Sequence, residues 1–315
     1  MTLFSRKARP LTAEESRDAE QRRLQLVMKA LKSIHTTVDM ETEALERQRR
    51  GQELLGRLVA PMRGMDYEEF ELNGLKCAWV RPQRGYARQY AILYCHGGGY
   101  TSGNLGYSRI LASKLAYVTG YPVLSFEYRL APEHPYPAQL RDAMKVWDHL
   151  MYLGYGARDV VVAGDSAGGN LALVLSLKLK SQGRRLPRAL TLFSPWTDLT
   201  ASGPCYQEMA DKDPMLTVDY IHSITKVYAE GRDLRSPLLS PLFGDFSGFP
   251  PVLIQVGENE ILRSDSVRLR DRLVEAQTPC HLEVWDNLWH VFQMFPMKEA
   301  SQAMEHVGAF LLELF

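Results

Sequence analysis

The chain of 315 residues carries 37 Lys and Arg residues against 37 Asp and Glu residues, and 45% of its residues are hydrophobic. This balance creates no overall field that would favour nucleic acid or an anionic membrane, and it fits a globular protein. The first residues hold no apolar run of the length of a secretory signal, and no later run approaches the ~20 apolar residues of a membrane span. We therefore expect a cytoplasmic protein with no membrane span and no nucleic-acid partner.

The cysteines are widely spaced and form no Cys-x-x-Cys pair: Cys77, Cys95, Cys205 and Cys280. Both zinc sites and dithiol redox centres usually need such closely spaced cysteines. We therefore expect buried free thiols and no metal site.

The N-terminal part reads as helix from Arg22 to about Leu58. Leu24, Val27 and Leu31 fall on one face at the 3.6-residue spacing of a helix. Helices here would precede the alternating strands and helices expected downstream and would not be needed to cover the sheet. We predict that residues 1–65 form one part of a helical cap.

From residue 66 the pattern indicates an α/β core. Tyr67–Leu72 and Leu75–Val80 read as strands joined by Asn73-Gly74, a strong signal for a two-residue hairpin. Further strands are expected at Ala91–Cys95, Val123–Tyr128, Val160–Ala163, Leu190–Phe193, Val252–Val256 and His281–Trp285. Helices are expected at Arg109–Val118, Ala138–Leu153, Ala167–Lys180, Ser266–Ala276 and Glu299–Leu314. This alternation predicts a mostly parallel sheet of eight strands with helices on both faces.

One connection interrupts the alternation, from about residue 197 to residue 250. It is too long for a simple link between two strands and holds helix-like sequence marked by Pro and Gly. Long insertions in compact domains tend to be functional lids. We expect this segment to form the second part of the cap.

The segment Gly164–Gly168 reads Gly-Asp-Ser-Ala-Gly and runs from an apolar strand into an apolar helix. By itself the pattern is common, and a structural turn would explain it. Between a strand and a helix it predicts a nucleophile elbow, in which the glycines allow a sharp turn that exposes the hydroxyl of Ser166. The positive end of the following helix would point at the site.

A serine hydroxyl is a poor nucleophile until a base, held by an acid, takes its proton. In this kind of sheet the acid and then the histidine follow the serine along the chain. His290 follows the last predicted strand, and a structural histidine is the alternative reading. Among the acids after the preceding strand, Glu258 comes early and Asp265 lies where a helix begins, which suggests capping or a salt bridge. We therefore predict Glu260 as the acid.

A glycine-rich loop, His96–Gly99, follows an earlier strand. Such a loop can supply bare N–H groups to the oxyanion that forms when a serine attacks an acyl carbon. The expected donors are Gly98, Gly99 and Ala167, with Gly97 as a substitute. His96 would orient the loop, because it precedes the serine in the chain.

The sequence resembles the microbial esterases that are similar to mammalian hormone-sensitive lipase, within the α/β-hydrolase superfamily. The resemblance covers the chain from about residue 66 and rests on His96–Gly99, Glu127–Ala138, Gly164–Asn170 and His290–Phe292. It implies an α/β-hydrolase fold with a cap, no cofactor, an ester substrate with a short acyl chain, and members that often form homodimers.

The resemblance also assigns supporting roles below the site to Arg129, Glu133 and His134. Glu260-Ile261-Leu262 stands where the family commonly has Asp-Pro-Leu and resembles a subset that uses Glu. Trp289 stands where a small residue is usual, and we expect it to line the substrate pocket with Phe292 and Tyr100.

The function predicted from these observations is hydrolysis of a carboxylic ester through an acyl-enzyme on Ser166. Hydrolysis of amides or peptides by the same residues is the nearer alternative. A small-molecule receptor on the same scaffold is a second one, against which the retained His290 argues.

Overall fold

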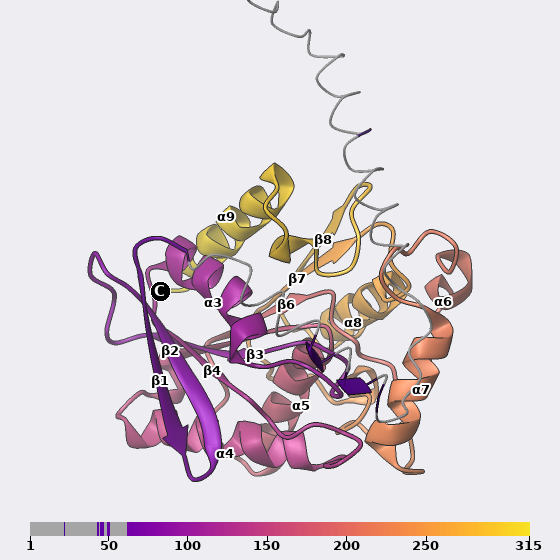
Figure 1. Cartoon of the computed structure of the whole chain (residues 1–315), viewed down its shortest axis with the longest axis horizontal. Coiled ribbons are helices and arrows are strands. Elements are labelled where there is room, and N and C mark those ends of the chain that lie inside the picture. The colour runs from indigo at the N-terminus through magenta and orange to yellow at the C-terminus, as the bar shows by residue number, and fades with distance from the viewer. Residues whose placement is uncertain (1–21, 23–42, 44, 47–48, 51–61) are drawn as a thin grey trace, which may run out of the picture.

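The computed structural model describes residues 62–315 together with residues 22, 43, 45, 46, 49 and 50. This part contains an eight-stranded sheet in the order β1-β2-β4-β3-β5-β6-β7-β8 (Figure 1). The strands are β1 Met65–Leu72, β2 Leu75–Pro82, β3 Ala91–Cys95, β4 Val123–Phe126, β5 Val160–Asp165, β6 Ala189–Phe193, β7 Val252–Gly257 and β8 Cys280–Trp285. Strand β2 pairs antiparallel with β1 and β4, and all other pairs are parallel. The predicted mostly parallel sheet is confirmed.

The predicted hairpin joins β1 and β2. Asn73 and Gly74 both have positive φ, 49° and 81°, as a tight turn between twisted strands requires. Strand β5 is longer than predicted, because Gly164 and Asp165 still pair with Leu192 and Phe193 of β6. Ladder pairing thus outweighs the low strand propensity of glycine and aspartate and carries β5 directly up to the serine.

Helices cover both faces of the sheet. Their bounds are α3 Leu105–Thr119, α4 Ala138–Tyr152, α5 Ala167–Ser181, α6 Cys205–Glu208, α7 Val218–Ala229, α8 Arg263–Glu275 and α9 Lys298–Leu312. Three short 3₁₀ helices are η1 Ala157–Asp159, η2 Pro241–Phe243 and η3 Phe292–Met294. Helices α3 and α9 lie on one face, and α4, α5 and α8 lie on the other (Figure 1).

Two hydrophobic cores follow from the alternation of side chains along each strand. In β3, Ile92 and Tyr94 pack with the residues of α3 and α9, whereas Leu93 and Cys95 pack with those of α4, α5 and α8. Both faces of the central strands are therefore apolar, as expected for parallel strands covered by helices on both sides.

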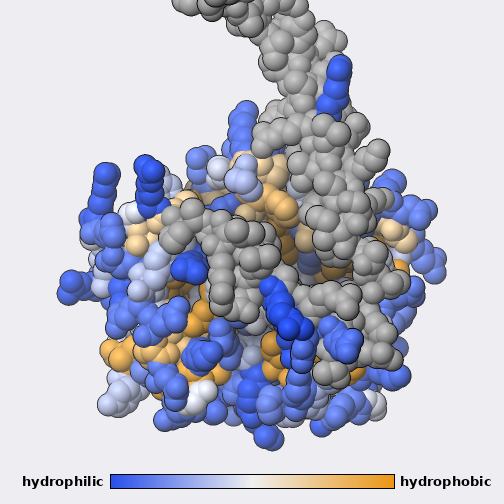
Figure 2. All heavy atoms as spheres, in the orientation of Figure 1, coloured by the Kyte–Doolittle hydropathy of each residue, from blue (hydrophilic) through white to orange (hydrophobic). Residues whose placement is uncertain are grey.

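The insertion at residues 197–250 contains α6, α7 and η2. The ring of Tyr228 in α7 stacks on that of Tyr100, with centroids 4.0 Å apart. Nearly all of the predicted N-terminal helix lies outside the described residues. Hydrophilic side chains spread over most of the described part of the face in Figure 2, with hydrophobic residues in smaller patches between them. No helix in the described residues is both long and apolar enough to cross a membrane.

Candidate active site

The turn between β5 and α5 carries Ser166 in a strained conformation, with φ 53° and ψ −119°. The turn has no room for side chains on its two glycines. A Cβ on Gly164 would lie 2.2 Å from the carbonyl oxygen of Gly168, and one on Gly168 would lie 2.0 Å from that of Cys95. Ser166 is the N-cap residue of α5, so it lies at the positive end of the helix dipole.

His290 and Glu260 meet in the loops that follow β8 and β7. The Nδ1 of His290 donates a hydrogen bond of 2.7 Å to Oε2 of Glu260. The other carboxylate oxygen, Oε1, accepts hydrogen bonds from the backbone N–H of Gly257 at 2.6 Å and from the hydroxyl of Ser194 at 2.8 Å. Glu260 is fully buried and His290 is 4% exposed. The structure thus brings the predicted acid and the predicted base into direct contact.

Ser194, which directly follows β6, links the serine turn to this pair and was missed from the sequence. The N–H of Ser166 donates to the carbonyl oxygen of Phe193 at 2.9 Å. The next residue, Ser194, accepts from the N–H of Val291 at 3.1 Å besides donating to Glu260. These bonds hold the ends of β5, β6, β7 and β8 together around one point.

Nearby carboxylates raise the pKa of His290. Burial alone would lower the pKa of its imidazole. The hydrogen bond and charge of Glu260 oppose this, and the charges of Asp213 and Asp165 add to them, so the pKa is raised above 6.5. The protonated ring is therefore stabilised, as a proton acceptor in this position needs.

The glycine-rich loop after β3 lies beside the elbow, where Gly168 approaches the carbonyl oxygens of Cys95 and His96. Gly98 has φ 105°, and its carbonyl oxygen accepts from the N–H groups of Thr101 and Ser102 at 3.1 and 3.0 Å. No bond to another described residue uses the N–H of Gly98 or Gly99. The N–H of Gly97, the predicted substitute donor, is instead engaged with Oδ1 of Asp165 at 2.8 Å.

His96 and Asp165 fix this loop from below. His96 donates from Nδ1 to the carbonyl oxygen of Gly97 at 2.7 Å and stacks on Tyr128. Its burial lowers the pKa to about 4, so the ring is neutral near pH 7. Asp165 accepts from the hydroxyl of Tyr107 at 2.9 Å and, as noted, from Gly97. Asp165 was assigned no role of its own from the sequence. Its place within the Gly-Asp-Ser-Ala-Gly motif was the only feature that could have pointed to it.

Two of the three expected supports make ion pairs. Arg129 binds Asp142, with Nε to Oδ2 at 2.9 Å, and the guanidinium of Arg49 binds both carboxylate oxygens of Glu133 at 2.7 and 2.8 Å. Arg49 also donates to the carbonyl oxygen of Thr101. The side chain of His134 is exposed.

The other acids near Glu260 have separate partners. Glu258 accepts from the N–H of Asn287 at 2.8 Å. Asp265 neither caps α8 nor pairs with a described cation, so the sequence prediction for it was wrong. It is fully buried and accepts from the N–H groups of Thr197 and Asp198 at 2.8 and 2.9 Å. Two backbone donors from a distant loop bind one of its oxygens, Oδ2, instead.

The aromatic residues predicted to line the pocket are buried in packing contacts. Trp289 and Phe292 are fully buried in a cluster with Met297 and with Ala300 and Ala303 of α9. Tyr100 is also fully buried, and its hydroxyl donates to Asn170 at 2.7 Å. These rings are thus held in packing contacts, and a role in the substrate pocket stays a prediction.

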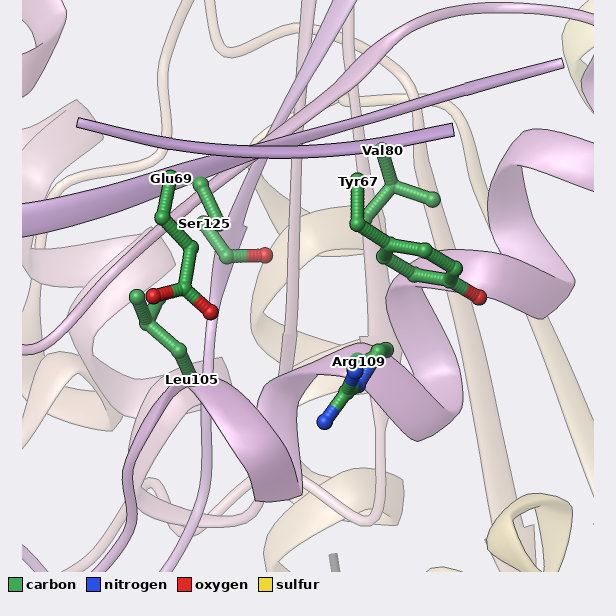
Figure 3. Close-up of a pocket in the computed structure, with 7 residues that line it drawn as sticks. Tyr67, Glu69, Val80, Leu105, Arg109 and Ser125 are labelled. Carbon is green, nitrogen blue, oxygen red and sulfur yellow. The ribbon is translucent and has the colours of Figure 1, made fainter. Parts of the chain in front are cut away.

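A small pocket lies elsewhere, between the β1–β2 hairpin and α3 (Figure 3). Tyr67, Glu69 and Ser125 line it, together with Arg109, whose guanidinium lies over the ring of Tyr67. None of the predicted site residues is among its lining. In the part of the chain that the structure describes, no cluster of three or more His, Cys, Asp or Glu side chains could hold a metal ion.

A mostly parallel sheet with a serine elbow after β5 and a carboxylate–histidine pair after β7 and β8 has the architecture of an α/β hydrolase. A family model described as "alpha/beta hydrolase fold" matches residues 92–294. An acetyl-hydrolase of Streptomyces hygroscopicus is 36% identical over 83% of this chain and 86% of its own. An esterase of Acinetobacter venetianus is 36% identical over 78% and 82%.

The solved structure of an esterase from the bacterial hormone-sensitive lipase family superposes with a TM-score of 0.87, at 33% identity over 92% of this chain and 97% of that one. This chain belongs to the α/β-hydrolase family. The resemblance seen in the sequence is thereby confirmed.

Proposed function

We propose that this α/β hydrolase is a serine carboxylesterase whose catalytic triad is Ser166, His290 and Glu260. The observation that carries the proposal is the buried hydrogen bond between His290 and Glu260 next to a strained serine turn. The retained pair also argues against a receptor without catalysis. The esterases and the acetyl-hydrolase among the relatives support an ester substrate over an amide.

In the first half of the reaction the Ser166 oxygen attacks the acyl carbon of the ester while His290 takes the hydroxyl proton. The N–H groups of Gly98, Gly99 and Ala167 stabilise the oxyanion, each contributing ~10²–10³ in kcat. The C–O bond of the ester then breaks, and His290 gives its proton to the leaving alcohol. Water attacks the acyl-enzyme by the same steps, releasing the acid and restoring Ser166.

We further propose a preference for acyl chains of roughly two to eight carbons. A Cβ on Gly99 would lie 2.7 Å from the hydroxyl of Tyr220 and 2.9 Å from Cδ1 of Ile224. Helix α7 therefore closes directly over the proposed oxyanion loop and limits the room for an acyl chain. In this proposal residues 197–250 act as a cap, together with residues 1–65. The homodimer and the cytoplasmic location stay predictions.

The test is Ser166→Ala, which should lower kcat on the order of 10⁶ while circular dichroism stays unchanged. An organophosphate should label Ser166 of the wild type. Aryl esters of increasing acyl length should give the highest kcat/KM among short chains. Label on another serine would contradict the mechanism, and a maximum on long-chain emulsions would contradict the substrate range.

The pH profile supplies an independent test. Protonated His290 cannot accept the serine proton, so kcat/KM should fall as the pH drops through its pKa. Because that pKa is raised, the midpoint of the acid limb should lie above 6.5. A midpoint clearly below this value would contradict the role of His290 as the base.

A further inference from the structure

Asp213 is a buried carboxylate for which the proposed reaction has no role. It lies between α6 and α7, in the insertion that links β6 to β7, and its side chain is only 5% exposed. Burying a carboxylate is costly unless hydrogen bonds compensate for the lost water. The hydrogen bonds of Asp213 therefore indicate its role in the structure.

Three backbone N–H groups satisfy Asp213. Oδ1 accepts from Met215 at 2.8 Å and from Leu216 at 2.9 Å, which closes a turn just before α7. Oδ2 reaches across to a different loop and accepts from the N–H of Ile261 at 2.9 Å. Ile261 is fully buried and directly follows Glu260. One carboxylate thus ties the insertion to the backbone that carries the proposed catalytic acid.

Asp213 also faces His290 electrostatically. The carboxylates that act on this imidazole come from three segments: Glu260 after β7, Asp165 at the end of β5 and Asp213 in the insertion. Burial raises the pKa of Asp213 to about 6, and the charge of His290 holds it down. At pH 8 Asp213 therefore carries a negative charge that favours protonated His290.

We propose that Asp213 is a positioning residue for catalysis: it fixes the backbone at Glu260, stabilises the protonated form of His290 and couples the insertion to the triad. This inference rests on the proposed function. Because Asp213 acts through Glu260 and His290 and not on the substrate, its loss should lower kcat more than it changes KM.

Asp213→Asn is the test, since it removes the charge and turns one acceptor into a donor. Either the bond to Ile261 or the bonds in the turn before α7 are then lost. We expect kcat to fall roughly tenfold to a hundredfold, as for a small misplacement of a catalytic group. The acid limb of kcat/KM should move to lower pH, because His290 loses a favourable negative neighbour. A purely structural role would reduce the fraction of active enzyme without moving this midpoint.

Asp219→Asn is the matched control, with the same chemical change on an exposed residue in the first turn of α7. Its kcat and midpoint should equal those of the wild type. Titration of Ser166 with an organophosphate counts the active sites of each variant, so misfolded protein does not enter kcat. Asp213→Glu keeps the charge and displaces the carboxylate by one methylene. It should keep the wild-type midpoint while kcat falls, and it serves as the test if the Asn variant does not fold.

An Asp213→Asn variant with the wild-type kcat and midpoint would overturn this inference while the wild type remains an active esterase. A midpoint that moves equally in Asp213→Glu would overturn the role of the charge. Wild-type protein that hydrolyses no ester and takes label on another serine would overturn the proposed function, and this inference with it.

Discussion

The serine turn and the histidine–carboxylate pair are fixed by different physical means. At the turn, backbone atoms approach so closely that Gly164 and Gly168 have no room for a side chain. At the pair, hydrogen bonds from distant segments hold the loop that carries Glu260. Ser194 donates to the carboxylate of Glu260, and Asp213 accepts from the backbone N–H of Ile261. The serine turn is therefore sensitive to added side-chain volume, and the histidine–carboxylate pair is sensitive to a lost charge or hydrogen bond.

The largest effect in this comparison is expected from Glu260→Gln. Glutamine has nearly the same shape, but it cannot hold the required tautomer of His290 or stabilise its protonated ring. We expect kcat to fall on the order of 10⁴, as in serine proteases that lose the charge of the triad acid. Steady-state kinetics on a short aryl ester measures this change, after circular dichroism has shown that the variant is folded.

Glu258→Gln is the matched control, because Glu258 lies two residues away and its carboxylate accepts, among the described residues, only from the N–H of Asn287. Its kcat should stay within about threefold of the wild type. If Glu258→Gln loses activity and Glu260→Gln keeps it, the acid has been assigned to the wrong residue.

An intermediate effect is expected from Gly168→Ala on the serine side. The added Cβ would lie 2.0 Å from the carbonyl oxygen of Cys95 and 2.4 Å from that of His96. Relief of this clash moves the N-terminus of α5, and with it the N–H of Ala167, away from the glycine-rich loop. We expect kcat to fall roughly 10²–10³-fold, the usual loss for one oxyanion donor.

Gly183→Ala provides the comparison just beyond the other end of α5. Gly183 has φ 64°, but no heavy atom lies within 4 Å of an added Cβ. This change should cost about 1–2 kcal/mol of stability through backbone strain and leave kcat unchanged. Equal kcat values for the two variants would show that close packing at Gly168 does not set the oxyanion geometry.

The same contrast explains which features were readable from the sequence. The hairpin at Asn73-Gly74, the strands and the serine motif depend on local conformation, and they were predicted close to their observed positions. Ser194 and Asp213 were missed because their partners lie 66 and 48 residues away, and no local pattern pairs them. The burial of Trp289 against α9 was not predicted for the same reason, because it depends on packing that spacing does not encode.

Asp265→Asn should have the smallest effect on turnover and should appear instead in the pH dependence of stability. Burial raises the pKa of Asp265 from 3.8 to about 7. Between these values the folded protein keeps a proton that the unfolded chain releases, so this carboxyl favours folding less and less as the pH rises through that window. Asparagine carries no charge, yet its oxygen can still accept from the N–H groups of Thr197 and Asp198. The unfolding free energy should therefore fall less steeply from pH 4 to pH 7, by up to about 1.4 kcal/mol per pH unit.

Urea unfolding at several pH values measures this slope, and part of it should persist because Asp213 has a raised pKa as well. The kcat of Asp265→Asn should stay within about threefold of the wild type, since Asp265 binds the loop after β6 and makes no hydrogen bond to His290. An unchanged slope together with a collapse of kcat would mean that Asp265 serves the reaction directly. In that case Glu260 would not be the only acid that serves the reaction. The contrast between a serine turn fixed by close packing and an acid fixed by hydrogen bonds would then not hold.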